Sequence, residues 1–374
     1  MSAPETTTNR FSIQSIFHFL PYVIPIIAFV VLVVEWNTEI PVLLGVITVI
    51  VLASAVLASV HHAEVVAHKV GEPFGSVILA VAVTVIEVGM IIMLMMSSPE
   101  SGTTLARDTV FAATMITTNL IIGLSLVAAT GGRKLAYFNK EGSGTAFSTV
   151  LLLAVSTLVF PSVTVSSPEG VFTTSQLLFF AVLALLIWVL FVVAQTRRHR
   201  DFFLPITKRG EIIAPDKHAD PPTTRTTIIS LVLLIVSLVS VVGLAKVLSK
   251  PIEEVVATAG LPEAFVGIVI AMLVLMPETI AAYKNARAGR TQIALNLGYG
   301  SAIASIGLTI PVVGIIAVGT ETPIVLGLDP MHLVFLALTA ALSILTIVQG
   351  RALRIQGTLH LVVGFAYIFL VAVP

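Results

Sequence analysis

The sequence contains no cysteine, and only 11% of its 374 residues are charged. Without cysteine the chain can form no disulfide, no thiolate metal site and no thiol nucleophile. Lysine and arginine together number 20, as do aspartate and glutamate. No basic surplus is therefore present for binding nucleic acid, and we expect no nucleic-acid partner.

Hydrophobic residues make up 57% of the chain, which is more apolar material than one soluble core could bury. This excludes a soluble enzyme with a single anchor and predicts an integral membrane protein whose partner is the lipid bilayer. Runs such as 26–34 and 177–193 are apolar on every face, which favours helices over a transmembrane barrel. At about 20 residues per span, the chain predicts an all-α fold with about eleven spans: 16–35, 39–60, 75–97, 108–130, 146–166, 175–195, 227–248, 263–283, 292–318, 331–349 and 357–373.

Basic residues predict the orientation in the membrane. The polar N-terminus lacks a small-residue cleavage site, so we expect the first helix to be retained. With the N-terminus in the cytoplasm, 17 of the 20 basic residues lie inside, and only Arg107, Lys246 and Lys250 lie outside. The odd number of spans then leaves the C-terminus outside.

The two halves of the chain resemble each other. Residues 64–67 recur as residues 254–257, and Glu72 to Glu87 and Glu263 to Glu278 are both separations of 15 residues. Each copy has five spans, so the second copy enters the membrane from the opposite side. We therefore predict an N-terminal segment with an extra helix (1–35), a first five-helix repeat (36–195), a cytoplasmic linker (196–226) and a second, inverted repeat (227–374).

Only two of the 20 acidic residues, Glu87 and Glu278, lie deep within hydrophobic runs. A charge there costs at least ~2.5 kcal/mol, so such acids face a cavity or a counter-ion. Two carboxylates facing each other at low dielectric cannot both ionise without a cation, so they bind protons or a metal ion. Hard cations such as Ca²⁺ take oxygen ligands, and Na⁺ fits oxygen ligands as well. A structural carboxylate is the alternative interpretation.

Other polar residues near the two acids are weaker candidates. Asn119 and Asn296, one in each copy, are candidate ligands, and Ser301, Ser305 and Thr309 share one helical face. Hydroxyl groups also commonly join membrane helices. Pro277 predicts a helix break beside Glu278 that exposes backbone carbonyls. Candidates for a cation-attracting mouth or for pH sensing are Glu64, Glu72, Glu263, His62 and His68, although a solvated interfacial helix would also explain the histidines.

Several segments resemble the bacterial calcium/proton antiporters of the calcium/cation antiporter superfamily. They are 62–75, 82–88, 107–111, 275–278, 296–301 and 307–311. The resemblance implies two inverted five-helix repeats, Glu87 and Glu278 as central ligands, and Asn119, Asn296 and Ser301 lining the site. It also implies the bacterial inner (plasma) membrane. Val83-Thr84 and Val274-Leu275 stand where some members have Gly-Asn, and this departure bears on ion selectivity.

These observations predict a secondary antiporter, and no enzyme, that exports Ca²⁺ from the cytoplasm in exchange for H⁺ by alternating access. The transported cations and protons are its partners, and no cofactor is expected. A monovalent Na⁺ or K⁺/H⁺ antiporter of the same fold is the first alternative. A cation channel would not need an inverted repeat, and an intramembrane enzyme would need a motif such as His-Glu-x-x-His, which is absent. An oligomeric state does not follow from the sequence.

Overall fold

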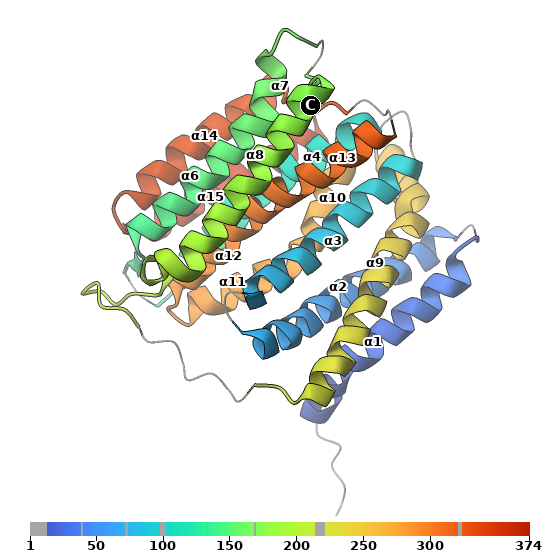
Figure 1. Ribbon diagram of the computed structural model, residues 1–374, viewed down its shortest axis with the longest axis horizontal. Helices are drawn as coiled ribbons and strands as arrows, with labels where there is room; N and C mark the ends of the chain where they lie inside the picture. Colours follow the sequence, from blue (N-terminus) through green and yellow to red (C-terminus); the bar gives the residue numbers. More distant parts are fainter. Residues whose placement is uncertain are drawn as a thin grey trace, which may run out of the picture.

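A computed structural model describes residues 13–38, 40–71, 74–97, 102–132, 134–167, 170–213, 221–320 and 324–374. Within these residues the chain is nearly all helical, with helices packed lengthwise against one another (Figure 1). The predicted all-α membrane architecture is confirmed. Glu72 lies outside the described residues.

The first half of the chain covers the predicted first six spans. Its elements are α1 (Ile13–Glu35), α2 (Val42–Val70), α3 (Phe74–Ser97), α4 (Gly102–Met115), η1 (Ile116–Ile121), α5 (Ile122–Ala129), β1 (Ala136–Tyr137), α6 (Lys140–Ala154), η2 (Val155–Val159), α7 (Phe160–Val163), α8 (Thr174–Val193), η3 (Ala194–Arg198) and η4 (Arg200–Phe203).

The second half covers the remaining predicted spans. Its elements are α9 (Thr224–Thr258), α10 (Ala264–Val274), α11 (Met276–Arg287), α12 (Thr291–Ala304), η5 (Ser305–Thr309), α13 (Ile310–Gly319), α14 (Pro330–Ile347), β2 (Arg351–Ala352) and α15 (Arg354–Ala372).

Every predicted span falls on helix, although the number of membrane crossings stays a prediction. Among the described residues, eight helical segments are long and apolar enough to cross a bilayer, and the bent pair α10–α11 makes a ninth. Shorter apolar helices cover Phe19–Glu35 and Val81–Met93. The helix α2 runs ten residues beyond its predicted end at residue 60, because polar residues end the hydrophobic run without ending the backbone hydrogen bonding.

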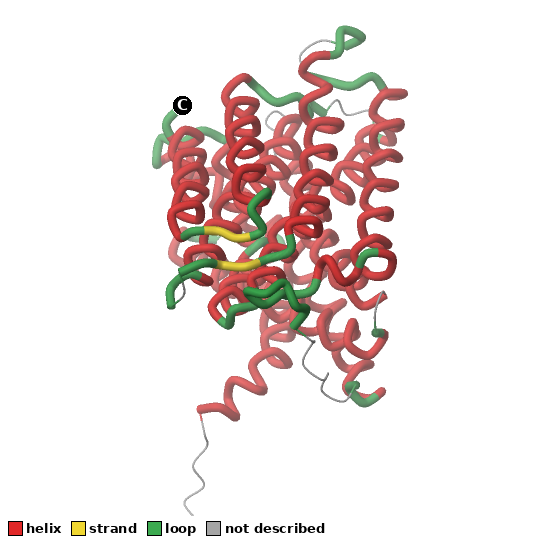
Figure 2. Tube along the Cα trace, turned by 90° about the vertical axis from the view of Figure 1, so that its left-hand side faces the viewer, coloured by secondary structure: helices red, strands yellow, loops and turns green. Residues whose placement is uncertain are grey.

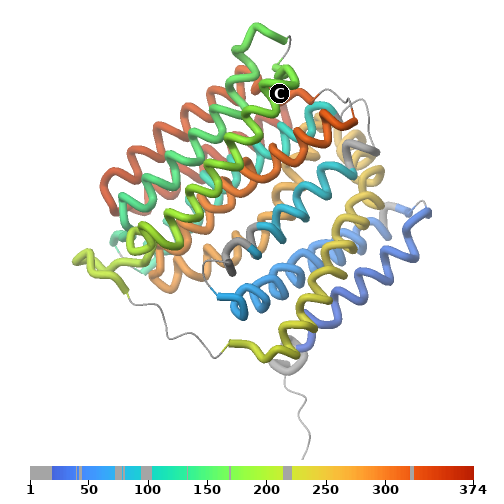
Figure 3. Tube along the Cα trace, viewed as in Figure 1, coloured from blue at the N-terminus to red at the C-terminus, as the bar shows by residue number. Residues whose placement is uncertain are grey.

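The helices form two packing groups. In Figures 1 and 3, α1, α2 and α9 lie side by side, and one hydrophobic cluster joins them to α3 and to part of α10. A second and larger cluster joins α4, α5, α6 and α8 with α10 to α15. Because α10 contributes side chains to both clusters, the bent pair α10–α11 lies where the two groups meet.

A short sheet connects the two halves of the chain. The strands β1 and β2 pair antiparallel, with Ala136 opposite Ala352 and Tyr137 opposite Arg351. In Figure 2 these strands lie well away from the C-terminus, which is at the other end of the bundle. This contact joins the α5–α6 connection to the α14–α15 connection.

Four described segments are π-helical, and two of them fall in the helices that follow the two buried acids. One is η1, between α4 and α5, and the other is η5, between α12 and α13. A π-helical turn changes the direction of the side chains after it relative to an unbroken α-helix, and such turns are frequent at functional sites. Hydropathy did not predict them, because a π-helical turn leaves the apolar run unchanged.

Candidate functional site

The acid Glu87 lies near the middle of the unbroken helix α3 and is only 4% exposed. The hydroxyl of Ser305 donates a hydrogen bond to its Oε1 atom. Thr309, four residues further along, lies beside the same carboxylate and is fully buried. The π-helical turn η5 therefore presents two hydroxyl groups to Glu87.

The acid Glu278 lies in the first turn of α11, directly after a bend of 52° between α10 and α11. Leu275 at the bend has left the helical conformation, with φ −85° and ψ 2°. Pro277 lacks an amide hydrogen, so it leaves one carbonyl of α10 without its usual helical donor. A carboxylate in this position is stabilised by the positive end of the α11 dipole.

The two repeat-related acids come together in space. Glu278 is partly buried and lies within electrostatic range of Glu87. Its Oε2 atom is buried, and it has no hydrogen-bond partner among the described residues. The carboxyl groups of Glu87 and Glu278 and the hydroxyl groups of Ser305 and Thr309 together form a set of oxygen atoms that can bind a hard cation.

A third acid, Glu64, interacts with Glu278. Glu64 on α2 interacts electrostatically with Glu278 and with Lys284, which lies further along α11. Both Glu64 and Lys284 are exposed. The sequence pattern indicated Glu64 but gave no sign of Lys284, because the contact depends on how α2 packs against α11.

The two predicted asparagines make contacts with other helices. The Nδ2 atom of Asn119 donates to Thr339 Oγ1 at 2.9 Å, and its Oδ1 atom lies 3.3 Å from His360 Nδ1. The Nδ2 atom of Asn296 donates to the carbonyl of Phe203 at 2.7 Å, and its Oδ1 atom accepts from Gln292 at 2.8 Å. Both ends of each amide are thus already paired within the protein.

The remaining candidates are spread over both packing groups. His62 is fully buried between α1 and α2, with Nε2 3.0 Å from the carbonyl of Pro21. His68 is exposed near the end of α2, and Glu263 is exposed at the start of α10. Ser301 is partly buried on α12, one turn before Ser305.

The sequence pattern did not single out Ser305 as a ligand, although it placed Ser305 on one face with Ser301. The four-residue spacing along that face was the available signal. Which of the two hydroxyls reaches Glu87 depends on the π-helical turn, which begins at Ser305 itself.

Replacing Ser305 by alanine is expected to weaken cation binding about ten- to hundredfold, because it removes a hydrogen bond to a charged group, which contributes roughly 1.5–3 kcal/mol. The measurement is the cation concentration at half-maximal exchange in proteoliposomes. The matched control is Ser301→Ala, one turn away on the same helix, with a smaller expected effect. A larger effect of Ser301→Ala would show that Ser301 is the ligand.

Comparison with known proteins places the chain among cation transporters. The sequence profile of the family described as "Sodium/calcium exchanger protein" matches residues 10–197 and 229–373. The putative ionic transporter y4hA of Sinorhizobium fredii is 39% identical over 327 residues, which cover 86% of this chain and 87% of that protein. The sodium-potassium/proton antiporter ChaA of Escherichia coli is 31% identical over 351 residues, which cover 92% and 94%.

Among solved structures, the H⁺/Ca²⁺ exchanger CAX has a similar fold. It superposes with a TM-score of 0.68 over 96% of this chain and 93% of that chain, at 14% sequence identity. This likeness shows the fold. The profile match and the two sequence relatives confirm the resemblance to the calcium/cation antiporter superfamily and the prediction of an integral membrane cation antiporter. From the profile match and the two sequence relatives, we conclude that the chain belongs to the sodium/calcium exchanger family.

Proposed function

We propose that this membrane cation exchanger exports Ca²⁺ from the cytoplasm in exchange for H⁺, with Glu87 and Glu278 as a shared site for metal and protons. The observation that carries the proposal is the electrostatic interaction between these two acids, which occupy matching positions in the two similar sequence segments. A divalent cation would neutralise two carboxylates together. Two protons would do the same, so metal and protons compete for the same oxygen atoms.

The oxygen atoms around the acids suit a hard cation. Ca²⁺ takes 6–8 oxygen ligands at roughly 2.3–2.6 Å. Glu87, Glu278, Ser305 and Thr309 would supply several of them, and water and the carbonyls at the α10–α11 bend would supply others. Because the amides of Asn119 and Asn296 are already paired, the proposed ligand set does not depend on them.

Access to the site is proposed from the cytoplasmic side. The exposed Glu64 interacts electrostatically with both Glu278 and Lys284. Lys284 lies in the last turn of α11, as does the basic residue Arg287. The positive-inside rule places these basic residues in the cytoplasm, with the N-terminus inside and the C-terminus outside a bacterial inner membrane. Glu64 would then draw cations toward Glu278.

A monovalent cation is the second candidate substrate. The relative ChaA, 31% identical over most of both chains, is named a sodium-potassium/proton antiporter. Na⁺ or K⁺ would bind the same oxygen atoms and would need only one of the two acids in its charged form. The mechanism would stay the same, and the number of protons exchanged for each cation would change.

The test is a pH-sensitive dye in proteoliposomes that hold a proton gradient, with Ca²⁺, Na⁺, K⁺ and Mg²⁺ added separately. We expect Ca²⁺ to dissipate the gradient at a concentration at least about tenfold below that of Na⁺ or K⁺, since two carboxylates favour a divalent ion. Dissipation by Na⁺ or K⁺ alone would establish the monovalent alternative. If none of the four ions dissipates the proton gradient, the proposal is overturned.

A further inference from the structure

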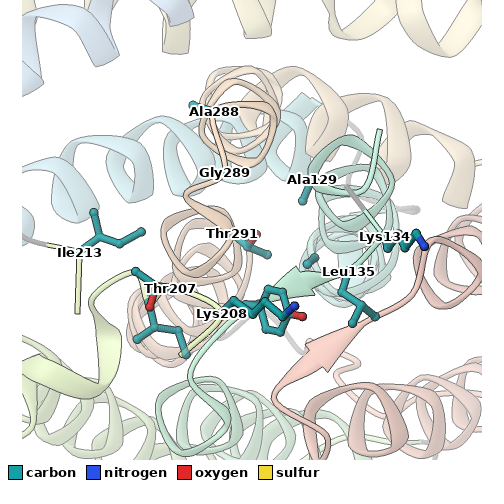
Figure 4. A pocket seen from close by; sticks show the side chains of 12 residues that line it. Ala129, Lys134, Leu135, Thr207, Lys208, Ile213, Ala288, Gly289 and Thr291 are labelled. Carbon is teal, nitrogen blue, oxygen red and sulfur yellow. The ribbon is translucent and has the colours of Figure 1, made fainter. Parts of the chain in front are cut away.

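A cavity of about 630 Å³ lies at the N-terminal end of α12, separate from the residues of the transport site. Its walls come from the end of α5, strand β1 and the loop before it, the linker around Thr207, and the turn between α11 and α12 (Figure 4). Two exposed lysines, Lys134 and Lys208, line the cavity on different walls. No acidic residue is among its described lining residues, so the cavity is electropositive.

The start of α12 adds uncompensated hydrogen-bond donors. Arg290 is the N-cap residue, and no side chain caps the first turn of this 14-residue helix. The amides of Thr291 and Gln292 have no acceptor within the helix, whereas the amide of Ile293 already donates to the carbonyl of Arg290 at 3.1 Å. The helix dipole places positive charge at this end. Gly289, with φ 85°, turns the chain sharply from α11 into α12 and brings the helix start to the cavity wall.

Thr291 gives an independent sign of a ligand. The residue is only 3% exposed, and its side chain lines the cavity (Figure 4). Within the described part of the chain its hydroxyl has no hydrogen-bond partner. The hydroxyl oxygen is therefore open to the cavity, where a bound ligand can accept its hydrogen. The positive-inside rule explains basic residues in general, but it does not explain a hydroxyl group at this place.

From these observations we propose that the cavity binds a phosphate group through the Thr291 hydroxyl, the first amides of α12, and the side chains of Lys134 and Lys208. A phosphate accepts several hydrogen bonds and carries negative charge, so it satisfies all of these donors together. Either the headgroup of an anionic phospholipid or free phosphate would supply this chemistry, since basic pockets near the cytoplasmic membrane surface bind lipid headgroups.

The site is connected to the transport machinery through the chain. Glu278 lies in the helix before the α11–α12 turn, and Ser305 begins the π-helical turn directly after α12. A ligand that holds this turn would restrict how α11 and α12 move relative to each other. Phosphate binding would therefore change the exchange rate without contributing a ligand to the transported cation.

The test measures the melting temperature of the full-length protein in detergent. It compares inorganic phosphate, added as its choline salt, with choline chloride at matched ionic strength and pH and without transported cations. We expect phosphate to raise the melting temperature of the wild type. In Lys134→Gln/Lys208→Gln, half-maximal stabilisation should require at least about tenfold more phosphate. Thr291→Val should weaken the response several-fold. The control Arg225→Gln/Arg354→Gln removes the same charge outside the cavity and should respond like the wild type.

A parallel arm compares vesicles of phosphatidylglycerol with vesicles of phosphatidylcholine. If phosphatidylglycerol stabilises the wild type, free phosphate and phosphatidylcholine do not, and the double lysine variant loses the effect, the site is supported and its ligand is a lipid headgroup. No response to either probe, or equal responses of the wild type and the double lysine variant, would overturn the proposal. Because the readout needs no transport, these results are independent of the ion specificity proposed above.

Discussion

Replacing Glu87 by glutamine is expected to abolish cation/proton exchange while leaving membrane insertion intact. Glutamine keeps an oxygen that can accept the hydrogen bond from Ser305, so the packing of α3 against η5 should survive. The variant loses the negative charge that balances the cation and the group that carries the proton. Loss of one charged partner at a buried site costs roughly 2–5 kcal/mol. This corresponds to about 30-fold to several-thousand-fold weaker binding.

The measurement is dye-monitored exchange in proteoliposomes, with the amount of inserted protein determined separately. The control is Glu141→Gln, which makes the same chemical change at an exposed position at the start of α6 and should exchange at the wild-type rate. Exchange by Glu87→Gln at more than about a tenth of the wild-type rate would exclude Glu87 as a shared metal and proton ligand.

Replacing Glu278 by glutamine is expected to have an equally large effect on exchange and a different effect on stability. The Oε2 atom of Glu278 is buried and has no hydrogen-bond partner in the described part of the chain, and both Glu87 and Glu64 repel its charge. Removing the charge relieves this repulsion, so the variant without substrate should melt at the same temperature as the wild type or higher. Added Ca²⁺ should stabilise the wild type in proportion to its occupancy but should leave the variant unchanged.

Thermal denaturation in detergent, with and without Ca²⁺, measures both effects. The conservative variant Glu278→Asp separates charge from position, because it keeps a carboxylate that is shorter by one methylene group. It should recover part of the Ca²⁺ stabilisation. If Glu278→Gln keeps the full Ca²⁺ response, Glu278 is a structural carboxylate and the proposed ligand set is wrong.

Hydropathy and charge along the chain determine where this protein is helical and which of its acids are unusual. A run of about 20 apolar residues has few stable alternatives to a helix in a bilayer, because every backbone polar group must be paired internally. The helical segments therefore follow from local sequence, and the cost of burying a charge in lipid marks Glu87 and Glu278. Their equal spacing from Glu72 and Glu263 connects them to a repeat, which a single sequence can reveal.

Tertiary structure decided which polar atoms meet. The residue pattern suggested Asn119 and Asn296 as ligands, and the family resemblance added Ser301. Packing instead pairs the two amides with other residues and brings the hydroxyl of Ser305 to Glu87. The π-helical turn and the bend at Leu275 set these directions. Pro277 predicted a break beside Glu278, whereas the π-helical turn leaves hydropathy unchanged and had no sign in the sequence. The approach of Glu64 to Lys284 and the basic cavity beside Thr291 each join segments far apart in the chain. Such contacts depend on how helices pack, and a linear pattern carries no information about that.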